Sequence, residues 1–276
     1  MFKVTLTYLL KKPADNDAIQ KVWSVVAGYS RKGQLVGEVL VTLGPGSRSL
    51  CVTGMVHERS SLSRKYESRE TRNALAELSP LLRKRPTLDR ERLAEDGGTC
   101  TCTRSTALVF APDVILGASP LRCLDCWDRR PLYRLRSRSA DEDLRELARQ
   151  WISFYWMFMD SGSTEALAWR QLADPESIFS RMTRKRLKGF EKKLGIPVYF
   201  ELYTHYISRS PDPPEVRICP GCGRRWSRLD EKWTTCARCR LVSHLPNERD
   251  LPDWWRPLPR HRSARRPTKS GRGPRP

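Results

Sequence analysis

Apolar side chains in the first hundred residues are spaced alternately as in strands and as in helices. Alternating positions predict a strand over 2–10, and apolar residues on one helical face predict a helix over 15–29. Two β-rich runs, 35–43 and 49–56, flank the turn-rich GPGSR and predict a hairpin, and helical spacing returns over 68–83. This order predicts a small α+β unit in which helices cover one face of a largely antiparallel sheet.

The longest helical pattern follows a capping box, Ser139 with Glu142, and ends at Gly162. Its apolar residues form one broad stripe: Leu144, Leu147, Ala148, Trp151, Ile152, Tyr155, Phe158 and Met159. A wide, continuous stripe is typical of a helix packed on the main core. A platform on which nucleic-acid bases stack is the alternative interpretation of its aromatic residues.

A second helical pattern covers 174–194. Asp174 is the predicted N-cap, Pro175 suits the first turn, and Gly195 is placed just after the last helical residue. The β-rich stretch 196–208 then predicts a strand that leads into a proline-rich hinge.

Four cysteines near the C-terminal end are spaced as two C-x2-C pairs thirteen residues apart: Cys219, Cys222, Cys236 and Cys239. Two such pairs on tight turns can direct four thiolates at one point, which is the tetrahedral arrangement of a structural Zn²⁺ site. Gly221 and Gly223 suit turns of this kind. Four protein ligands leave no open position, so the predicted metal is structural rather than catalytic. Two disulfides are the alternative, which the spacing disfavours.

Five further cysteines remain, and four of them form a second candidate site. Cys100-x-Cys102 and Cys123-x2-Cys126 are separated by twenty residues that include the strand-like run TALVFAPDVILG. The pattern predicts one zinc site in the ribbon and allows a second here, with buried apolar thiols as the alternative. Cys51 lies in a predicted strand and is expected to be a small core residue.

The predicted architecture is α+β, with an N-terminal α+β domain, a central Cys-rich β module, a helical segment, a C-terminal zinc ribbon and a disordered basic tail. In residue numbers these parts are 1–98, 99–138, 139–210, 211–246 and 247–276. The tail is rich in Pro, Gly and Arg and lacks acidic residues after residue 255, so it cannot bury enough apolar surface to fold.

The net charge of the chain favours polyanions as partners. The chain has 51 Lys and Arg against 31 Asp and Glu, a formal net charge of +20. This excess favours nucleic acid, and an acidic protein is the other candidate partner. No apolar run is long enough to cross a bilayer, and the N-terminus is expected to be a strand rather than a signal peptide. The expected location is the cytoplasm, where cysteines stay reduced.

Two groups of cations are candidate phosphate contacts. The helix over 174–194 carries one basic face, formed by Arg181, Arg184, Lys185, Lys188 and Lys192. The ribbon interleaves cations with an indole, in the set Arg224, Arg225, Trp226, Arg228, Arg238 and Arg240. A solvated basic face, and tryptophans that only cover the zinc turns, are the alternatives; Trp233 is assigned to packing and Trp226 stays open.

Four motifs carry a resemblance to a known family. They are PLYRL at 131–135, GIPVYFELYTHY at 195–206, CPGCG at 219–223 and CARCRLVSHLP at 236–246. Together they resemble an uncharacterised bacterial family of zinc-ribbon proteins with a suggested role in nucleic-acid binding. The resemblance covers residues 1–246 and implies that Cys219, Cys222, Cys236 and Cys239 are its metal ligands, with no established activity. The basic extension after Pro246 departs from the family.

Two functions therefore follow from the sequence. The first is a zinc-ribbon protein that binds nucleic acid without catalysis, with RNA or single strands favoured because no recognition-helix motif is present. The second is a zinc-stabilised protein-interaction module of the adaptor, antitoxin or immunity type. An enzyme is not expected, because the sequence contains no catalytic set, no phosphate-cradling glycine loop and no evident small-molecule site.

Overall fold

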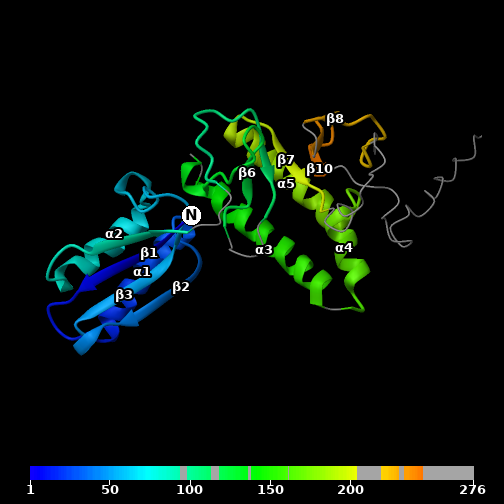
Figure 1. Cartoon of the computed structure of the whole chain (residues 1–276). Coiled ribbons are helices and arrows are strands. Elements are labelled where there is room, and N and C mark those ends of the chain that lie inside the picture. The colour runs from blue at the N-terminus through cyan, green and yellow to red at the C-terminus, as the bar shows by residue number, and fades with distance from the viewer. Residues whose placement is uncertain are drawn as a thin grey trace, which may run out of the picture.

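A computed structural model describes residues 1–93, 98–112, 118–135, 138–160, 162–203, 219–229 and 233–244, without the side chains of 138–141, 228 and 244. The described residues form an α+β fold with two sheets. Figure 1 shows the N-terminal unit, in blue to cyan, beside a second unit in green to orange. The predicted tail over 247–276 and the hinge before the ribbon lie outside the described residues.

The N-terminal unit has six main elements: β1 (Phe2–Leu9), α1 (Asn16–Arg31), β2 (Val36–Leu43), β3 (Ser49–Val56), α2 (Arg69–Leu78) and β4 (Thr87–Arg92). The antiparallel sheet has the order β2-β3-β1-β4, which is the ferredoxin-like arrangement. The predicted strand, helix, hairpin and helix are confirmed. Strand β4 was not predicted, because its sequence TLDRER is polar and mostly exposed. Such a sequence is compatible with a strand at the edge of a sheet.

One face of this sheet forms the core of the N-terminal unit. Val4, Leu6 and Tyr8 alternate along β1 and pack with the buried residues of α1 and α2, such as Val22 and Leu78. Each helix begins at a side-chain cap: Asp15 accepts a hydrogen bond from the backbone N–H of Ala18, and Ser68 accepts one from that of Thr71. Short 3₁₀ turns cover Pro45–Ser47, Arg64–Tyr66, Ser79–Leu81 and, in the second unit, Leu132–Arg134.

The second unit contains a six-stranded sheet in the order β6-β5-β7-β10-β9-β8. Its strands are β5 (Leu108–Phe110), β6 (Leu121–Cys123), β7 (Val198–Glu201), β8 (Ser227–Arg228), β9 (Trp233–Cys236) and β10 (Leu241–His244). Strand β7 pairs in parallel with both β5 and β10. This one sheet therefore contains strands from three of the predicted parts: the central module, the helical segment and the ribbon.

Helices α3 (Arg138–Asp160), α4 (Glu165–Ala173) and α5 (Ile178–Leu194) pack on one face of this sheet. Leu144, Leu147 and Trp151 of α3 are buried there, as a core helix requires, whereas Met159 is 47% exposed. The prediction of a helix packed on the core is confirmed for the central part of the stripe, and the alternative of a base-stacking platform does not apply there. No helix among the described residues combines the length and apolarity that a membrane crossing needs.

Two boundaries differ from the sequence prediction. Helix α5 starts at Ile178 because Ser177, rather than Asp174, is its N-cap and accepts from the N–H of Ser180. Its end at the left-handed Gly195 is as predicted. Helix α4 was not anticipated, and β7 covers only four residues of the strand predicted over 196–208, of which 204–208 lie outside the described residues.

Polar contacts join the two units. The Glu58 carboxylate accepts hydrogen bonds from the guanidinium of Arg134 and, at 3.1 Å, from the hydroxyl of Tyr133. The hydroxyls of Tyr133 and Ser61 lie 2.8 Å apart. These groups are partly or fully buried, so the contacts hold the end of β3 against the segment that precedes α3.

Glu201, at the end of β7, predicts a pH-dependent stability. Burial raises the pKa of its carboxyl from 4.5 to about 7, against the opposing charge of Arg122. Between these values the folded protein holds a proton that the unfolded chain has released, so stability falls as pH rises. Because the side chain keeps some exposure, we expect this group to remove about 1–2 kcal/mol between pH 5 and 7.5.

Glu201→Gln removes this titration while keeping the shape of the side chain. Urea unfolding of the parent and the variant at several pH values measures the difference between their free energies of unfolding. The difference should grow in favour of the variant as pH rises through 5 to 7. A difference that is constant with pH would show that Glu201 titrates normally.

Candidate functional site

The ribbon cluster consists of Cys219, Cys222, Cys236 and Cys239, whose sulfurs all lie within 4.8 Å of one another. Two thiolates bound to one tetrahedral zinc ion at about 2.3 Å would lie about 3.8 Å apart. The Sγ atoms of Cys222 and Cys236 are 3.7 Å apart, which fits this separation and is far too long for a disulfide. The four cysteines could thus hold one metal ion.

Tight turns bring the sulfurs of the ribbon cluster together. The backbone N–H of Gly223 donates to the carbonyl of Cys219 at 2.8 Å, and Gly223 has a left-handed φ of 68°. A Cβ on Gly221 would lie 3.1 Å from the Sγ of Cys239, so a larger residue would crowd that sulfur. The predicted need for both glycines has a direct geometric reason.

Local hydrogen bonding differentiates the thiols of the ribbon cluster. The backbone N–H of Arg224 donates to the sulfur of Cys222 and lowers the pKa of this thiol from 9.0 to about 7. Burial raises the pKa of Cys219. This hydrogen bond therefore favours the thiolate form of Cys222, which is the form that binds a metal.

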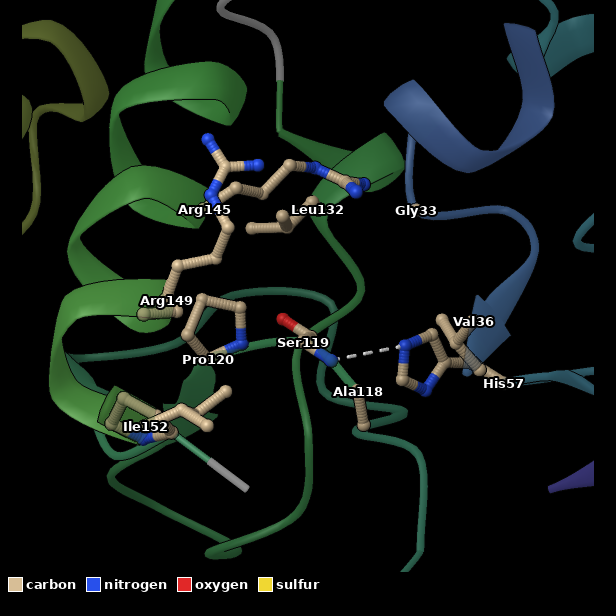
Figure 2. A pocket seen from close by; sticks show the side chains of 12 residues that line it. Gly33, Val36, His57, Ala118, Ser119, Pro120, Leu132, Arg145, Arg149 and Ile152 are labelled. Atoms are coloured by element: carbon tan, nitrogen blue, oxygen red, sulfur yellow. Dashed lines mark hydrogen bonds between the residues drawn. The ribbon is translucent and has the colours of Figure 1, made fainter. Parts of the chain in front are cut away.

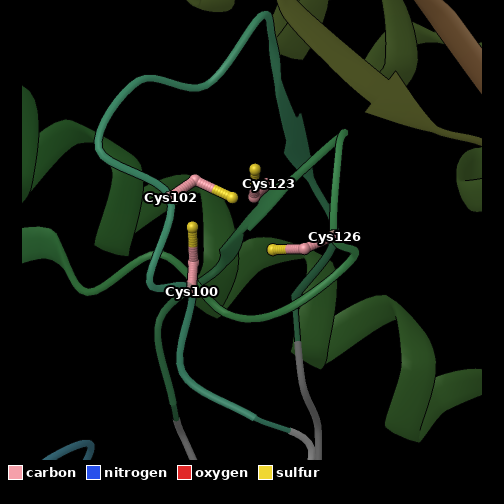
Figure 3. A group of neighbouring side chains, drawn as sticks. All are labelled: Cys100, Cys102, Cys123 and Cys126. Atoms are coloured by element: carbon pink, nitrogen blue, oxygen red, sulfur yellow. The ribbon is translucent and has the colours of Figure 1, made fainter.

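The central cluster consists of Cys100, Cys102, Cys123 and Cys126, and its sulfurs also lie within 4.8 Å of one another. Figure 3 shows the four side chains close together, with the sulfurs of Cys100, Cys102 and Cys126 directed toward the space between them. Cys123 ends β6, and the turn after it closes with a 2.8 Å hydrogen bond from the N–H of Trp127 to the carbonyl of Cys123. Cys100 and Cys123 are fully buried and Cys126 is exposed. This set could hold a second metal ion.

Two charged residues, Arg130 and Asp125, make contacts at the central cluster. Burial opposes ionisation of Cys100, but Arg130, whose Nη1 lies 3.5 Å from this sulfur, contributes to a net lowering of the thiol pKa. The same Nη1 donates to the carbonyl of Cys102 at 2.8 Å. Asp125 accepts from the backbone N–H of Thr106 at 2.8 Å and ties the Cys123 turn to the start of β5. Neither residue was predicted to contribute to this site. Asp125 lies within the C-x2-C pair, whereas the contact of Arg130 with Cys100 spans thirty residues and is made only by the fold.

A pair of tryptophans links the two clusters. Trp127 follows Cys126 with a φ of 62°, and its ring lies 3.9 Å, centroid to centroid, from that of Trp233 on β9. Both belong to an apolar group on the sheet face opposite the helices. Trp233 is 8% exposed, which confirms its assignment to packing. The role of Trp127 was missed, and its position beside a C-x2-C pair is the only signal for it.

The basic face of α5 faces the ribbon cluster across a hollow of about 440 Å³. Its walls are formed by Arg181, Arg184, Lys185 and Lys188 of α5 and by Gly221, Cys222, Arg238 and Cys239 of the ribbon. From the sequence, the cations of the helix and those of the ribbon were predicted as two separate groups. Their convergence on one hollow follows from the pairing of β10 with β7, the strand that follows α5.

Other residues predicted to contact nucleic acid have different surroundings. Lys192, Arg224 and Arg225 are exposed, outside the lining of the hollow. The guanidinium of Arg240 makes two bonds to the carboxylate of Glu191, at 2.6 and 3.0 Å, so its charge is paired. The side chain of Arg228 lies outside the described residues.

Two of the residues predicted to contact nucleic acid are engaged in contacts within the protein. Trp226 is 8% exposed and packs in the core of the second unit, so its ring has no open face on which a base could stack. Arg184 lines the hollow, but its Nη2 also donates to the carbonyl of Pro175 at 2.5 Å. Lys185 and Lys188 are exposed cations of the hollow and are the ones best placed to meet a ligand. Cys51 lies in β3 and belongs to neither cluster.

The fold and the two clusters define an α+β protein with two four-cysteine sites that could each hold a metal ion. Residues 102–203 match a family described as Domain of unknown function (DUF2310). Two uncharacterised proteins of Haemophilus influenzae are each 29% identical over 133 residues, or 46% of this chain. These alignments span 65% and 51% of the two relatives. The matches fit an uncharacterised bacterial family.

Solved structures resemble about a third of the chain. An antibiotic biosynthesis monooxygenase is 12% identical and covers 34% of this chain and 100% of its own, with a TM-score of 0.30. A conserved protein from Methanosarcina mazei is 15% identical, covers 33% and 90%, and has a TM-score of 0.28. A dimeric ferredoxin-like protein of unknown function from Thermobifida fusca is 13% identical, covers 34% and 92%, and has a TM-score of 0.27. Likeness at this level supports no conclusion about activity.

Proposed function

We propose that the protein binds nucleic acid without catalysis, through the hollow between α5 and a zinc-bound ribbon cluster. The observation that carries the proposal is the convergence of Arg181, Lys185, Lys188 and Arg238 on this hollow beside two cysteines of the cluster. Phosphate groups are the ligands that such a group of cations favours, because each neutralised phosphate releases bound counterions.

Zinc is the proposed metal of both clusters. Sets of four cysteines are typical of structural zinc in proteins, and the sulfur separation in the ribbon cluster fits a tetrahedral ion. Its four sulfurs would hold the ion and fix the knuckle that carries Arg238. Since four protein ligands leave no open position for substrate or water, the proposed role is structural.

The hollow favours contact with the backbone of a nucleic acid over contact with its bases. Trp226 and Trp233 are buried, so neither indole of the ribbon offers a stacking surface. Binding is therefore expected to depend strongly on salt and weakly on sequence. Single strands or RNA remain the proposed targets, since single-stranded chains can follow a narrow basic groove.

The test is the salt dependence of binding to a random single-stranded oligonucleotide. Lys185→Gln combined with Lys188→Gln removes two phosphate contacts and should lower the slope of log K against log salt by about 1.4. At about 0.1 M salt this corresponds to roughly 25-fold weaker binding. Fluorescence anisotropy at several salt concentrations measures both quantities.

A matched control lies on the same helix. Arg186 and Lys193 are exposed cations of α5 outside the lining of the hollow. Arg186→Gln combined with Lys193→Gln changes the net charge equally and should leave the slope nearly unchanged. Equal losses in the two double variants, or no binding by the parent protein at low salt, would refute the proposal.

A protein-interaction module is the second candidate function, and one observation favours a protein partner. Trp156 and Met159, near the end of α3, are each 47% exposed, and Met157 is 38% exposed. Large apolar side chains exposed together are typical of protein contact surfaces. A partner that binds there would be insensitive to substitutions in the hollow, which separates the two functions.

A further inference from the structure

A second basic cavity lies between the two units, and none of the eight cysteines of the two clusters is in its lining. It has a volume of about 160 Å³, which is room for a group the size of a phosphate ion together with water. The N-terminal unit contributes Gly33 and His57, the β5–β6 connection contributes Ser119, and α3 contributes Arg145 and Arg149. Figure 2 shows these side chains around the cavity.

Two guanidinium groups form one side of the cavity. Arg145 and Arg149 are one helical turn apart on α3, and like charges with this spacing repel each other. No carboxylate is among the described residues that line the cavity. Arg149 pairs with Glu146 at 2.6 Å, but this pair is largely exposed and is therefore weak.

The opposite side is held in a fixed orientation. The imidazole of His57 is 2% exposed, and its Nε2 accepts a hydrogen bond from the backbone N–H of Ser119 at 3.4 Å. The backbone carbonyl of His57 accepts from the hydroxyl of Thr99 at 2.8 Å. With Nε2 used as an acceptor, a neutral His57 has its proton on Nδ1. A polar ring with a defined tautomer thus completes the lining.

Gly33 makes room for one of the arginines. It has a left-handed φ of 68°, and a Cβ at this position would lie 2.8 Å from Nη2 of Arg145. Any larger residue would displace the guanidinium, so the turn after α1 is shaped to accept it. The guanidinium of Arg145, from the second unit, thus lies against the N-terminal unit at Gly33.

From this arrangement we propose that the cavity binds a small phosphate-bearing anion, and that this anion strengthens the association of the two units. Arg145 and Arg149 provide charged donors of the planar kind that suits phosphate oxygens. The ligand would contact residues from both units, so its binding would favour the arrangement in which they are docked. This inference does not depend on nucleic-acid binding in the hollow.

Inorganic phosphate is the probe for this site in the full-length, metal-loaded protein. Phosphate should raise the Tm in a saturable manner at constant ionic strength, while acetate, with one charge, should raise it less. His57 is one of four histidines, so its Cε1–H resonance can be assigned with a His57→Gln variant. This resonance should shift along the same saturation curve as the Tm.

Substitutions separate the cavity from the hollow. Arg145→Gln and Arg149→Gln should each weaken phosphate binding by about 10-fold or more, as the loss of a charged hydrogen bond does. If Arg145→Gln folds poorly, Arg145→Lys is the substitute test. It keeps the positive charge and should retain part of the affinity for phosphate. Lys185→Gln with Lys188→Gln should leave phosphate binding unchanged.

Two results would overturn the inference. One is a His57 resonance that does not respond to phosphate in a protein whose Tm does. The other is phosphate binding that disappears with the lysines of α5 and survives loss of both arginines of α3, which would place the anion in the hollow.

Discussion

Replacing Cys236 with Ser should reduce the bound zinc from two ions to one per chain and abolish oligonucleotide binding. Cys236 is 5% exposed at the end of β9, where its sulfur completes the ribbon cluster and its side chain packs in the core of the second unit. Structural zinc contributes about 10–16 kcal/mol to the folding of small zinc domains, far more than a ribbon of three short strands can otherwise supply. Loss of this ion should disorder the wall of the hollow that carries Arg238.

Elemental analysis and anisotropy measure the two consequences. Cys123→Ser is the informative comparison, because it should also leave one ion per chain but retain the hollow and its oligonucleotide binding. Cys51→Ser is the control, since this thiol belongs to neither cluster, and it should keep both ions. Two ions in the Cys236 variant, or a parent protein that contains no metal and still forms β8, β9 and β10, would contradict the assignment.

Replacing Phe200 with Ala should destabilise the second unit by about 3–5 kcal/mol and loosen the ribbon cluster with it. Phe200 is fully buried on β7, and its ring centroid lies 6.3 Å from those of Phe110 and Phe179. It stands opposite Phe110 of β5 and Leu241 of β10, so it lies where the central strands meet the ribbon strands. A cavity at this point removes packing from both sides.

Urea unfolding measures the loss of stability, and transfer of metal to a chromogenic chelator measures the loosening. Release from the ribbon cluster should become faster in proportion to the loss of stability. Leu40→Ala provides the control, because Leu40 is 54% exposed on β2 and its loss should change stability by no more than about 0.5 kcal/mol. An unchanged release rate would mean that the ribbon is held by its metal alone.

The N-terminal unit shows what local pattern can establish. Alternation along β1 and helical spacing in α1 predicted the elements, since each needs only one apolar face to pack. The edge strand β4 could not be found in this way, because its side chains are mostly exposed and its backbone hydrogen bonds to β1 supply what its sequence lacks. The start of α5 was also placed too early, since Asp174 and Ser177 are both acceptable caps and tertiary contacts decide between them.

The candidate site was likewise predicted only in part from the sequence. Spacing identified the eight cysteines, because closely spaced pairs are local features that aim two sulfurs at one point; turn glycines strengthened the prediction in the ribbon only. Spacing could not show that the two clusters are joined through Trp127 and Trp233, or that Arg130 supports Cys100. These contacts connect residues from different strands and loops.

The sequence by itself determined the class of those elements that have a clear apolar pattern, both sets of cysteines and the excess of positive charge, because these depend on composition and on neighbours within a few residues. Only the tertiary structure decided which surfaces meet. The parallel pairing of β7 with β10 brings the basic face of α5 to the ribbon cluster, and the docking of the two units encloses the cavity lined by His57 and Arg145. Such contacts depend on strand order and helix packing, which no local pattern specifies.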